Sequence, residues 1–139
     1  MKTLFTPIVK VKKFEVDKIQ IRLQQIESVI EQTQQTLKQI QYQILSITLP
    51  QEGNFGQILA QQMIKNAYLQ ELSEHQSHLH HLLHKKQECL EEKKKADLDY
   101  EKMKHLHDKE SSRLVALLKA KEAKELDEIG LTLFNAKGA

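Results

Sequence analysis

The chain has 139 residues, a length that allows one small domain. Aromatic residues make up 5% of the chain, Trp is absent, and there are only 4 Gly and 2 Pro, whereas Gln, Lys, Glu and Leu are abundant. This composition excludes a large globular core and is typical of long helices. The formal net charge is only +2 and Arg22 and Arg113 are the only arginines, which argues against nucleic-acid binding.

Cysteine content and hydropathy predict a reduced intracellular protein. Cys89 is the only cysteine, so no disulfide can form within the chain. The opening segment, Met1 to Val11, is too short and too interrupted by lysine for a secretory signal. No run approaches the ~20 apolar residues of a membrane span.

The first predicted helix covers about residues 7–47. Thr6 followed by Pro7 suits a helix start, since proline at the first helical position lacks an N–H that would have no partner there. Twelve positions at alternating steps of three and four form one seam, and all but Lys12 and Thr33 are apolar. They are Val9, Lys12, Val16, Ile19, Leu23, Ile26, Ile30, Thr33, Leu37, Ile40, Ile44 and Ile47. A sustained 3.5-residue period predicts a coiled coil and therefore a partner helix.

A turn is predicted at about residues 48–56, where Pro50, Gly53 and Gly56 are concentrated. Asn54 can cap the helix that follows. No other Pro or Gly occurs before Gly130, so the second helix is expected over about residues 57–130, with a short carboxyl-terminal tail.

The second helix carries a weaker seam. Lys86, Lys93, His107 and Glu110 interrupt it, which predicts a change of register or the loss of the partner helix in its second half. At 1.5 Å per residue the first helix is about 60 Å long and the second about 110 Å, so the carboxyl-terminal third must overhang. The seam positions are Tyr68, Leu72, His75, Leu79, Leu82, Lys86, Cys89, Lys93, Ala96, Tyr100, Met103, Leu114 and Leu117.

These patterns predict an all-α fold, a two-helix antiparallel coiled-coil hairpin whose second helix is longer and overhangs. Residues 1–139 are expected to form a single coiled-coil domain. The overhang still carries several leucines and Ile129, and such apolar surface indicates a partner or self-association.

Residues suited to chemistry are sparse. His80 and His84 have one-face helical spacing and could hold a divalent metal, but a structural site needs three or four ligands, so we expect no metal and no cofactor. The chain contains no phosphate-binding Gly-rich loop and no Ser-His-Asp order that this fold could assemble. The sequence therefore predicts a protein that is not an enzyme.

Both ends of the chain resemble the FliJ family, the small soluble component of the flagellar type III export apparatus. At the carboxyl end the similar residues are Lys121-Glu122-Ala123-Lys124-Glu125-Leu126-Asp127-Glu128-Ile129. In the first helix they are Phe14-Glu15-Val16-Asp17 and Ile40-Gln41-Tyr42-Gln43. Chain length and hairpin position also agree, so the resemblance covers nearly the whole chain.

The resemblance implies a stalk seated by its termini in the hexameric export ATPase FliI. Export occurs at the flagellar base, so it also implies a cytoplasmic protein peripheral to the inner membrane, which meets the membrane only through the apparatus. The residues expected to touch the ATPase are Lys121, Lys124, Asp127 and Glu128, together with Lys10, Lys12 and Lys13 on the antiparallel partner end.

The resemblance further implies contact with the export gate protein FlhA near the far end of the hairpin. Candidate residues are Gln39 and Tyr42 on the first helix and Tyr68, Leu72, His75 and Leu79 on the second. Seam packing explains the spacing of the last four equally well. The family also escorts export chaperones, whose surface the sequence does not place. This chain departs from the family pattern in having few arginines and many histidines.

Two alternatives stay open beside the stalk. One is a homo-oligomeric coiled-coil scaffold, which would be a dimer or larger on its own. The other is a helical metal-binding protein whose melting temperature would respond to zinc or nickel through His80 and His84.

Overall fold

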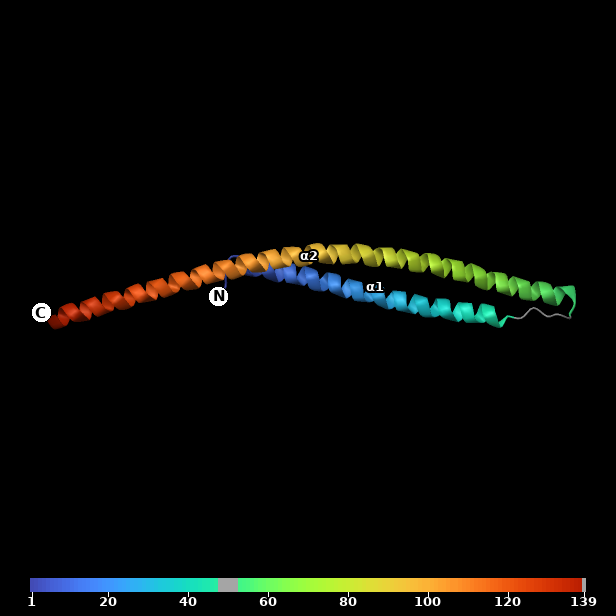
Figure 1. The fold of residues 1–139 in the computed structure, drawn as a ribbon, viewed down its shortest axis with the longest axis horizontal. Helices are drawn as coiled ribbons and strands as arrows, with labels where there is room; N and C mark the ends of the chain where they lie inside the picture. Colours follow the sequence, from blue (N-terminus) through green and yellow to red (C-terminus); the bar gives the residue numbers. More distant parts are fainter. Residues whose placement is uncertain (48–52, 139) are drawn as a thin grey trace. The chain divides into compact units, whose positions relative to one another are not determined.

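The computed structural model describes residues 1–47 and 53–138, and this part of the chain contains two helices and no strand. α1 spans Thr6–Ser46 and α2 spans Phe55–Gly138 (Figure 1). The two helices pack against each other, which confirms the predicted all-α helical hairpin. Most of the predicted turn, residues 48–52, lies outside the described residues.

Local hydrogen bonds explain where the helices begin. The Phe5 carbonyl accepts from the Val9 amide at 2.8 Å, so α1 starts at Thr6, one residue before the predicted start. Thr3 and Thr6 bond to each other at this end: the Thr3 amide donates to Thr6 Oγ1 (2.9 Å), and the Thr6 amide donates to the Thr3 carbonyl (3.2 Å). The Phe5 amide also donates to Thr3 Oγ1 (3.0 Å). At the start of α2, Asn54 Oδ1 accepts from the Gln57 amide at 2.8 Å, as expected of a cap.

The predicted end of the second helix at about residue 130 is wrong. α2 continues through Gly130 to Gly138, and a Cβ built on Gly130 would meet nothing within 4 Å. A single helical glycine costs only about 1 kcal/mol relative to alanine, which does not end a helix. The expected short tail is therefore helical up to Gly138.

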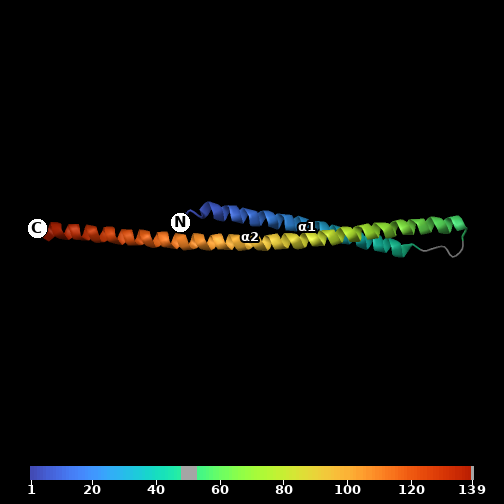
Figure 2. The same ribbon diagram turned by 90° about the horizontal axis from the view of Figure 1, so that it is seen from above.

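The hairpin divides into two compact units. One comprises Met1–Asp17 with Lys95–Ala139, and the other comprises Lys18–Lys94. Each unit contains a segment of α1 antiparallel to a segment of α2, as can be followed in Figures 1 and 2. The expectation of a single domain over residues 1–139 stays a prediction.

The α1 seam is confirmed at all twelve predicted positions, each of which is buried or half-buried. The most buried are Val16, Leu23, Ile30, Thr33, Leu37 and Ile40, with exposed fractions of 5–8%. Thr33 Oγ1 satisfies its hydroxyl by donating to the Val29 carbonyl at 2.8 Å within the same helix. All fully buried residues of α1 lie on this one seam, as expected of a helix in a two-helix coiled coil.

The α2 seam runs further and more regularly than predicted. Lys86 and Lys93 do not break it: both are half-buried and keep the three–four spacing. Lys86 reaches the seam edge, where its Nζ lies 3.7 Å from Glu27 Oε1. The unbroken α2 seam comprises Gln61, Lys65, Tyr68, Leu72, His75, Leu79, Leu82, Lys86, Cys89, Lys93, Ala96, Tyr100, Met103, His107, Glu110 and Leu114.

Past Leu114 the partner helix is lost. Every residue from 115 to 137 is exposed, and we call this segment of α2 the overhang. The prediction of a longer, overhanging second helix is confirmed. The predicted weakening of the α2 seam is thus explained by the loss of the partner helix after Leu114. The seam keeps its three–four spacing up to that residue.

Candidate protein-binding surfaces

The overhang presents the predicted ATPase-binding residues to solvent. Lys121, Lys124, Asp127 and Glu128 are all exposed. Three of them, with Leu117, continue the α2 seam spacing past Leu114, at positions 117, 121, 124 and 128. Because no described helix faces this segment, their charged groups are available to another molecule.

The three amino-terminal lysines do not gather with those of the overhang. Lys10 is exposed, Lys12 is half-buried in the α1 seam, and Lys13 Nζ lies 5.5 Å from the centre of the Tyr100 ring. Tyr100 precedes Lys121 by 21 residues (121 − 100), which is about 32 Å of helix. The predicted set therefore divides into a basic group on α1 and a separate group of mixed charge on the overhang.

The amino terminus is anchored on α2. Thr3 Oγ1 and His107 Nδ1 are 2.8 Å apart, a hydrogen bond across the first unit. His107 lies in the seam seven residues before Leu114 (114 − 107), the last seam residue before the overhang. This contact marks the level at which α1 ends its cover of α2.

The predicted gate-binding residues separate into exposed and seam positions. Gln39 is exposed and Tyr42 is 74% exposed, both on α1. Tyr68, Leu72, His75 and Leu79 are half-buried in the α2 seam, where packing against α1 accounts for them. Only the two α1 residues are therefore freely accessible.

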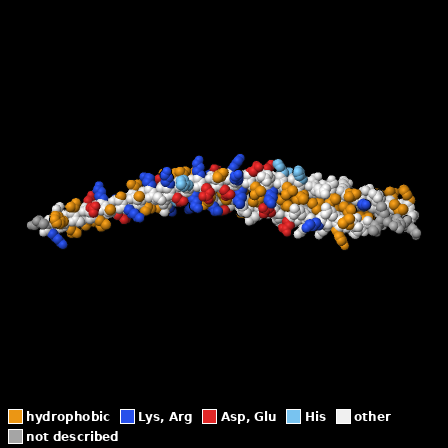
Figure 3. Space-filling model, viewed as in Figure 1, with side chains coloured by type: hydrophobic (Ala, Val, Ile, Leu, Met, Phe, Trp, Pro, Cys, Tyr) orange, Lys and Arg blue, Asp and Glu red, His pale blue; other side chains and the backbone are white. Residues whose placement is uncertain are grey.

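Sequence reasoning missed several exposed apolar side chains at the end of α1 and in the first turns of α2, both in the second unit. We call this group, together with Tyr42, the turn-end patch, and Figure 3 shows hydrophobic side chains gathered in this part of the molecule. Its members were missed because they lie off both seams, although apolar residues off a seam are themselves a signal. They are Leu45 (82% exposed), Leu59 (47%), Met63 (64%) and Ile64 (52%).

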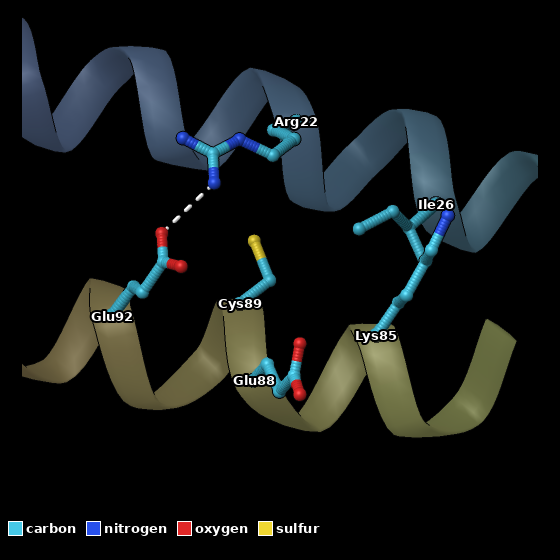
Figure 4. Close-up of a pocket in the computed structure, with 6 residues that line it drawn as sticks. All are labelled: Arg22, Ile26, Lys85, Glu88, Cys89 and Glu92. Atoms are coloured by element: carbon cyan, nitrogen blue, oxygen red, sulfur yellow. Dashed lines mark hydrogen bonds and ion pairs between the residues drawn. The ribbon is translucent and has the colours of Figure 1, made fainter. Parts of the chain in front are cut away.

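A groove of about 320 Å³ lies between the helices of the second unit (Figure 4). Its base is the thiol of Cys89, which is 2% exposed and donates to the Ile19 carbonyl at 3.7 Å. Arg22 Nη1 closes one side through an ion pair with Glu92 Oε2 at 2.8 Å. Glu88, also in the lining, pairs with His84 of the same helix at 3.0 Å, so the Arg22–Glu92 pair is the ion pair that crosses the groove in the described part of the chain.

The histidine-rich stretch offers little to a metal. His80 and His84 are both exposed, and His84 Nε2 lies 3.0 Å from Glu88 Oε1, an i,i+4 pair on the surface of α2. Among residues 1–47 and 53–138, no group of three or more His, Cys, Asp or Glu side chains is placed to hold a metal ion. No described helix is both long and apolar enough to cross a membrane.

Fold and surface together define an all-α helical hairpin that exposes charged and apolar side chains on its overhang and apolar side chains at the end of α1 and the start of α2. The family model described as "Flagellar FliJ protein" matches residues 1–139, the whole chain, and the chain belongs to this family. It is therefore a component of the flagellar type III export apparatus, in a family that is non-enzymatic. No curated protein and no solved structure matches the chain.

Proposed function

We propose that this chain is the central stalk of the FliI-like export ATPase ring and couples that ring to the FlhA-like export gate. One observation carries the proposal: α2 continues for the whole overhang, residues 115–137, with every side chain exposed. An unpartnered helix of this length that carries large apolar residues indicates a binding partner. Contacts with the ATPase and the gate would hold the protein in the cytoplasm at the inner membrane.

The overhang is the end proposed to enter the ATPase. Lys121, Lys124 and Glu128 occupy the line that faces α1 elsewhere in the hairpin, so a surrounding ring can contact them without opening the hairpin. Asp127 adds a second acidic group beside Glu128. Mixed charges suit orientation and specificity in a contact of this kind more than raw affinity.

The turn-end patch is the surface proposed to contact the gate. Tyr42 and Leu45 are 74% and 82% exposed, and Met63 is 64% exposed on α2. Tyrosine and methionine are enriched at protein interfaces, and these positions contribute nothing to the seam. The same chain would also escort export chaperones.

The first test is co-purification of the chain with its cognate export ATPase, beside a truncation that ends at Leu118. The truncation retains both seams, so circular dichroism is expected to show an intact hairpin. Loss of ATPase binding on truncation is the expected result. A full-length chain that fails to bind the ATPase would overturn the proposal.

A charge-reversal pair sharpens this test. Lys121→Glu with Lys124→Glu is expected to weaken ATPase binding at least tenfold, since both groups stand on the proposed contact line. Lys94→Glu with Lys95→Glu is the matched control, because these two lysines are also exposed on α2 but lie outside the overhang. Equal loss in both double variants would show that net charge, rather than the overhang, governs binding.

The gate contact has its own measurement. Tyr42→Ala with Leu45→Ala is expected to reduce binding to the isolated FlhA-like gate protein and to leave ATPase binding unchanged. Ile21→Ala, at a 56% exposed position on the same helix, is the control. Unchanged gate binding in the Tyr42 and Leu45 variant would remove the turn-end patch from the proposal.

A further inference from the structure

The amino terminus of the chain lies against α2 as a short segment outside any helix. Residues 1–5 precede α1, and we call them the amino-terminal strap. Thr3 Oγ1 lies 2.8 Å from His107 Nδ1, and this hydrogen bond joins the strap to α2 among the described residues. The strap is also bonded to the start of α1, because the Thr6 amide donates to the Thr3 carbonyl (3.2 Å) and the Val9 amide donates to the Phe5 carbonyl (2.8 Å). It is therefore a preformed turn that a single hydrogen bond fastens to α2.

The strap lies where the last part of the α2 seam is covered. Lys13 Nζ is 5.5 Å from the centre of the Tyr100 ring, and α1 begins at Thr6, seven residues before Lys13 (13 − 6). In an antiparallel pair of equal rise, α1 therefore begins at about the level of residue 107. Three residues of α2 lie beyond that level and are still half-buried, namely Glu110, Ser111 and Leu114. In this unit of the described chain, the strap is the segment placed to cover them.

The seam positions near the strap continue directly into the line of α2 that is proposed to contact the ATPase. His107, Glu110 and Leu114 are followed at the same three–four spacing by residues 117, 121, 124 and 128, all of which are exposed. Opening the strap would lengthen the exposed line by ten residues (117 − 107), which is about 15 Å of helix. The strap is therefore the first part of the hairpin that a partner on the overhang meets.

Little holds the strap closed. Met1 is 55% exposed and Leu4 is 89% exposed, so these two apolar side chains contribute little burial, and Phe5 is half-buried. One hydrogen bond of the kind made by Thr3 and His107 shifts an equilibrium by only about fivefold. Segments with few buried contacts open locally before the rest of a protein. The strap is thus expected to open while both helices stay paired.

We propose that the strap is an autoinhibitory contact, which competes with the export ATPase for the seam positions from His107 to Leu114. This inference rests on the proposed function of the overhang and adds a regulation to the same contact. With the strap closed, the ATPase contacts the line only from residue 117 onwards. With the strap open, the contact extends back to residue 107. A partner that needs the open form binds with an affinity reduced by the open fraction, so the strap weakens binding and is displaced when the ATPase engages.

The affinity for the ATPase tests the competition. Thr3→Val removes the hydroxyl that bonds to His107, and isothermal titration calorimetry is expected to show ATPase binding that is about two- to fivefold tighter than in the wild type. Thr36→Val is the matched control and is expected to leave the affinity unchanged, because Thr36 Oγ1 donates to the Gln32 carbonyl of its own helix (3.0 Å). Circular dichroism is expected to show the same helix content in both variants.

The outcomes separate the strap from the stalk. A wild type that binds the ATPase, beside a Thr3→Val variant that binds no more tightly, would overturn the strap proposal and leave the stalk proposal in place. If neither chain binds the ATPase, the stalk proposal fails and the strap proposal fails with it.

A distance measurement detects the opening directly. Spin labels are attached at Lys2→Cys and Lys109→Cys, two exposed positions on the strap and on α2, in a chain that also carries Cys89→Ala. Pulsed electron paramagnetic resonance is expected to show mainly one short distance in the free chain. Adding Thr3→Val or the ATPase is expected to increase the population of longer distances. A short distance that persists in the ATPase complex would overturn the proposal, since the strap would then stay closed.

Discussion

The thiol of Cys89 donates a hydrogen bond to the backbone carbonyl of Ile19, with Sγ and O 3.7 Å apart across the two helices. At 2% exposed, Cys89 is the most buried residue of the core. We expect it to react with a thiol reagent roughly 100-fold more slowly in the native protein than in denaturant, because the helices must separate to admit the reagent. Stopped-flow measurement with Ellman's reagent checks this, and a fast native reaction would show a seam that opens readily.

Alanine substitutions at two apolar positions of α1, two residues apart, are expected to differ strongly in their effect on stability. Leu23 is 5% exposed and Ile21 is 56% exposed. Leu23→Ala is expected to lower the free energy of unfolding by about 2–4 kcal/mol, because it leaves a cavity in the seam. Ile21→Ala removes a surface side chain and is expected to change it by less than about 0.5 kcal/mol. Urea titration followed by circular dichroism separates the two, and equal losses would contradict the burial of the α1 seam.

Replacing a seam lysine with leucine is expected to stabilise the hairpin. Lys93 is half-buried in the α2 seam and makes no ion pair in the described part of the chain, whereas its neighbour Lys94 is exposed. Lys93→Leu is expected to raise the free energy of unfolding by about 1 kcal/mol through additional apolar burial. Lys94→Leu is the matched control and should stay within about 0.5 kcal/mol of the wild type. A loss of stability in Lys93→Leu would mean that the lysine head makes a favourable contact at the seam edge.

Zinc and nickel are expected to leave the melting temperature unchanged. His80 and His84 offer two ligands on an exposed face, and a stable structural site needs three or four. Thermal melts with and without each metal check this, beside a variant carrying His80→Ala and His84→Ala. A rise in melting temperature that disappears in the double variant would instead support the metal-binding hypothesis.

One ion pair near the end of the seam gives a defined pH response. Arg113 Nε donates to Glu110 Oε2 at 3.0 Å, and this hydrogen bond holds the pKa of Glu110 below its ordinary value and raises that of Arg113. The pKa of Glu110 is lower in the folded protein than in the unfolded chain. Any stabilisation of the fold by this ion pair is therefore present above the pKa of the unfolded state, and it is lost as the pH falls through the pKa of the folded state. Arg113→Gln is expected to return the pKa of Glu110 towards its ordinary value in an NMR titration. An unchanged titration would show that the pair does not persist in solution.

The seam was predictable from sequence because it depends on period alone. Ten apolar residues at 3.5-residue spacing define the buried face of α1 without reference to any partner. The α2 seam was underestimated because Lys86 and Lys93 were counted as interruptions, although a lysine stem can lie along an apolar seam with its ammonium group at the edge. Gly130 was given too much weight as a helix end, because one glycine costs only about 1 kcal/mol and the helix-forming residues on both sides of it outweigh that cost.

The binding surfaces were only partly predictable. The resemblance located Lys121, Lys124 and Tyr42, and the structure leaves these residues exposed. The turn-end patch and the exposed apolar side chain of Phe14 were missed, since a search for a seam scores only the residues that face the partner helix. Leu45 and Phe14, both exposed and both apolar, carry no periodic signal of their own in such a search.

The sequence separations between paired residues imply an order in which the contacts between the two helices form during folding. Glu27 and Lys86 are 59 residues apart (86 − 27), Arg22 and Glu92 are 70 apart, and Thr3 and His107 are 104 apart. Closing the longest of these loops costs about 0.5 kcal/mol more conformational entropy than closing the shortest. The pairs that are closest in sequence are thus expected to form first, and the hydrogen bond between Thr3 and His107 is expected to form last. Reversible opening would begin at that hydrogen bond. Amide hydrogen exchange is therefore expected to be faster in residues 1–17 than in the rest of α1.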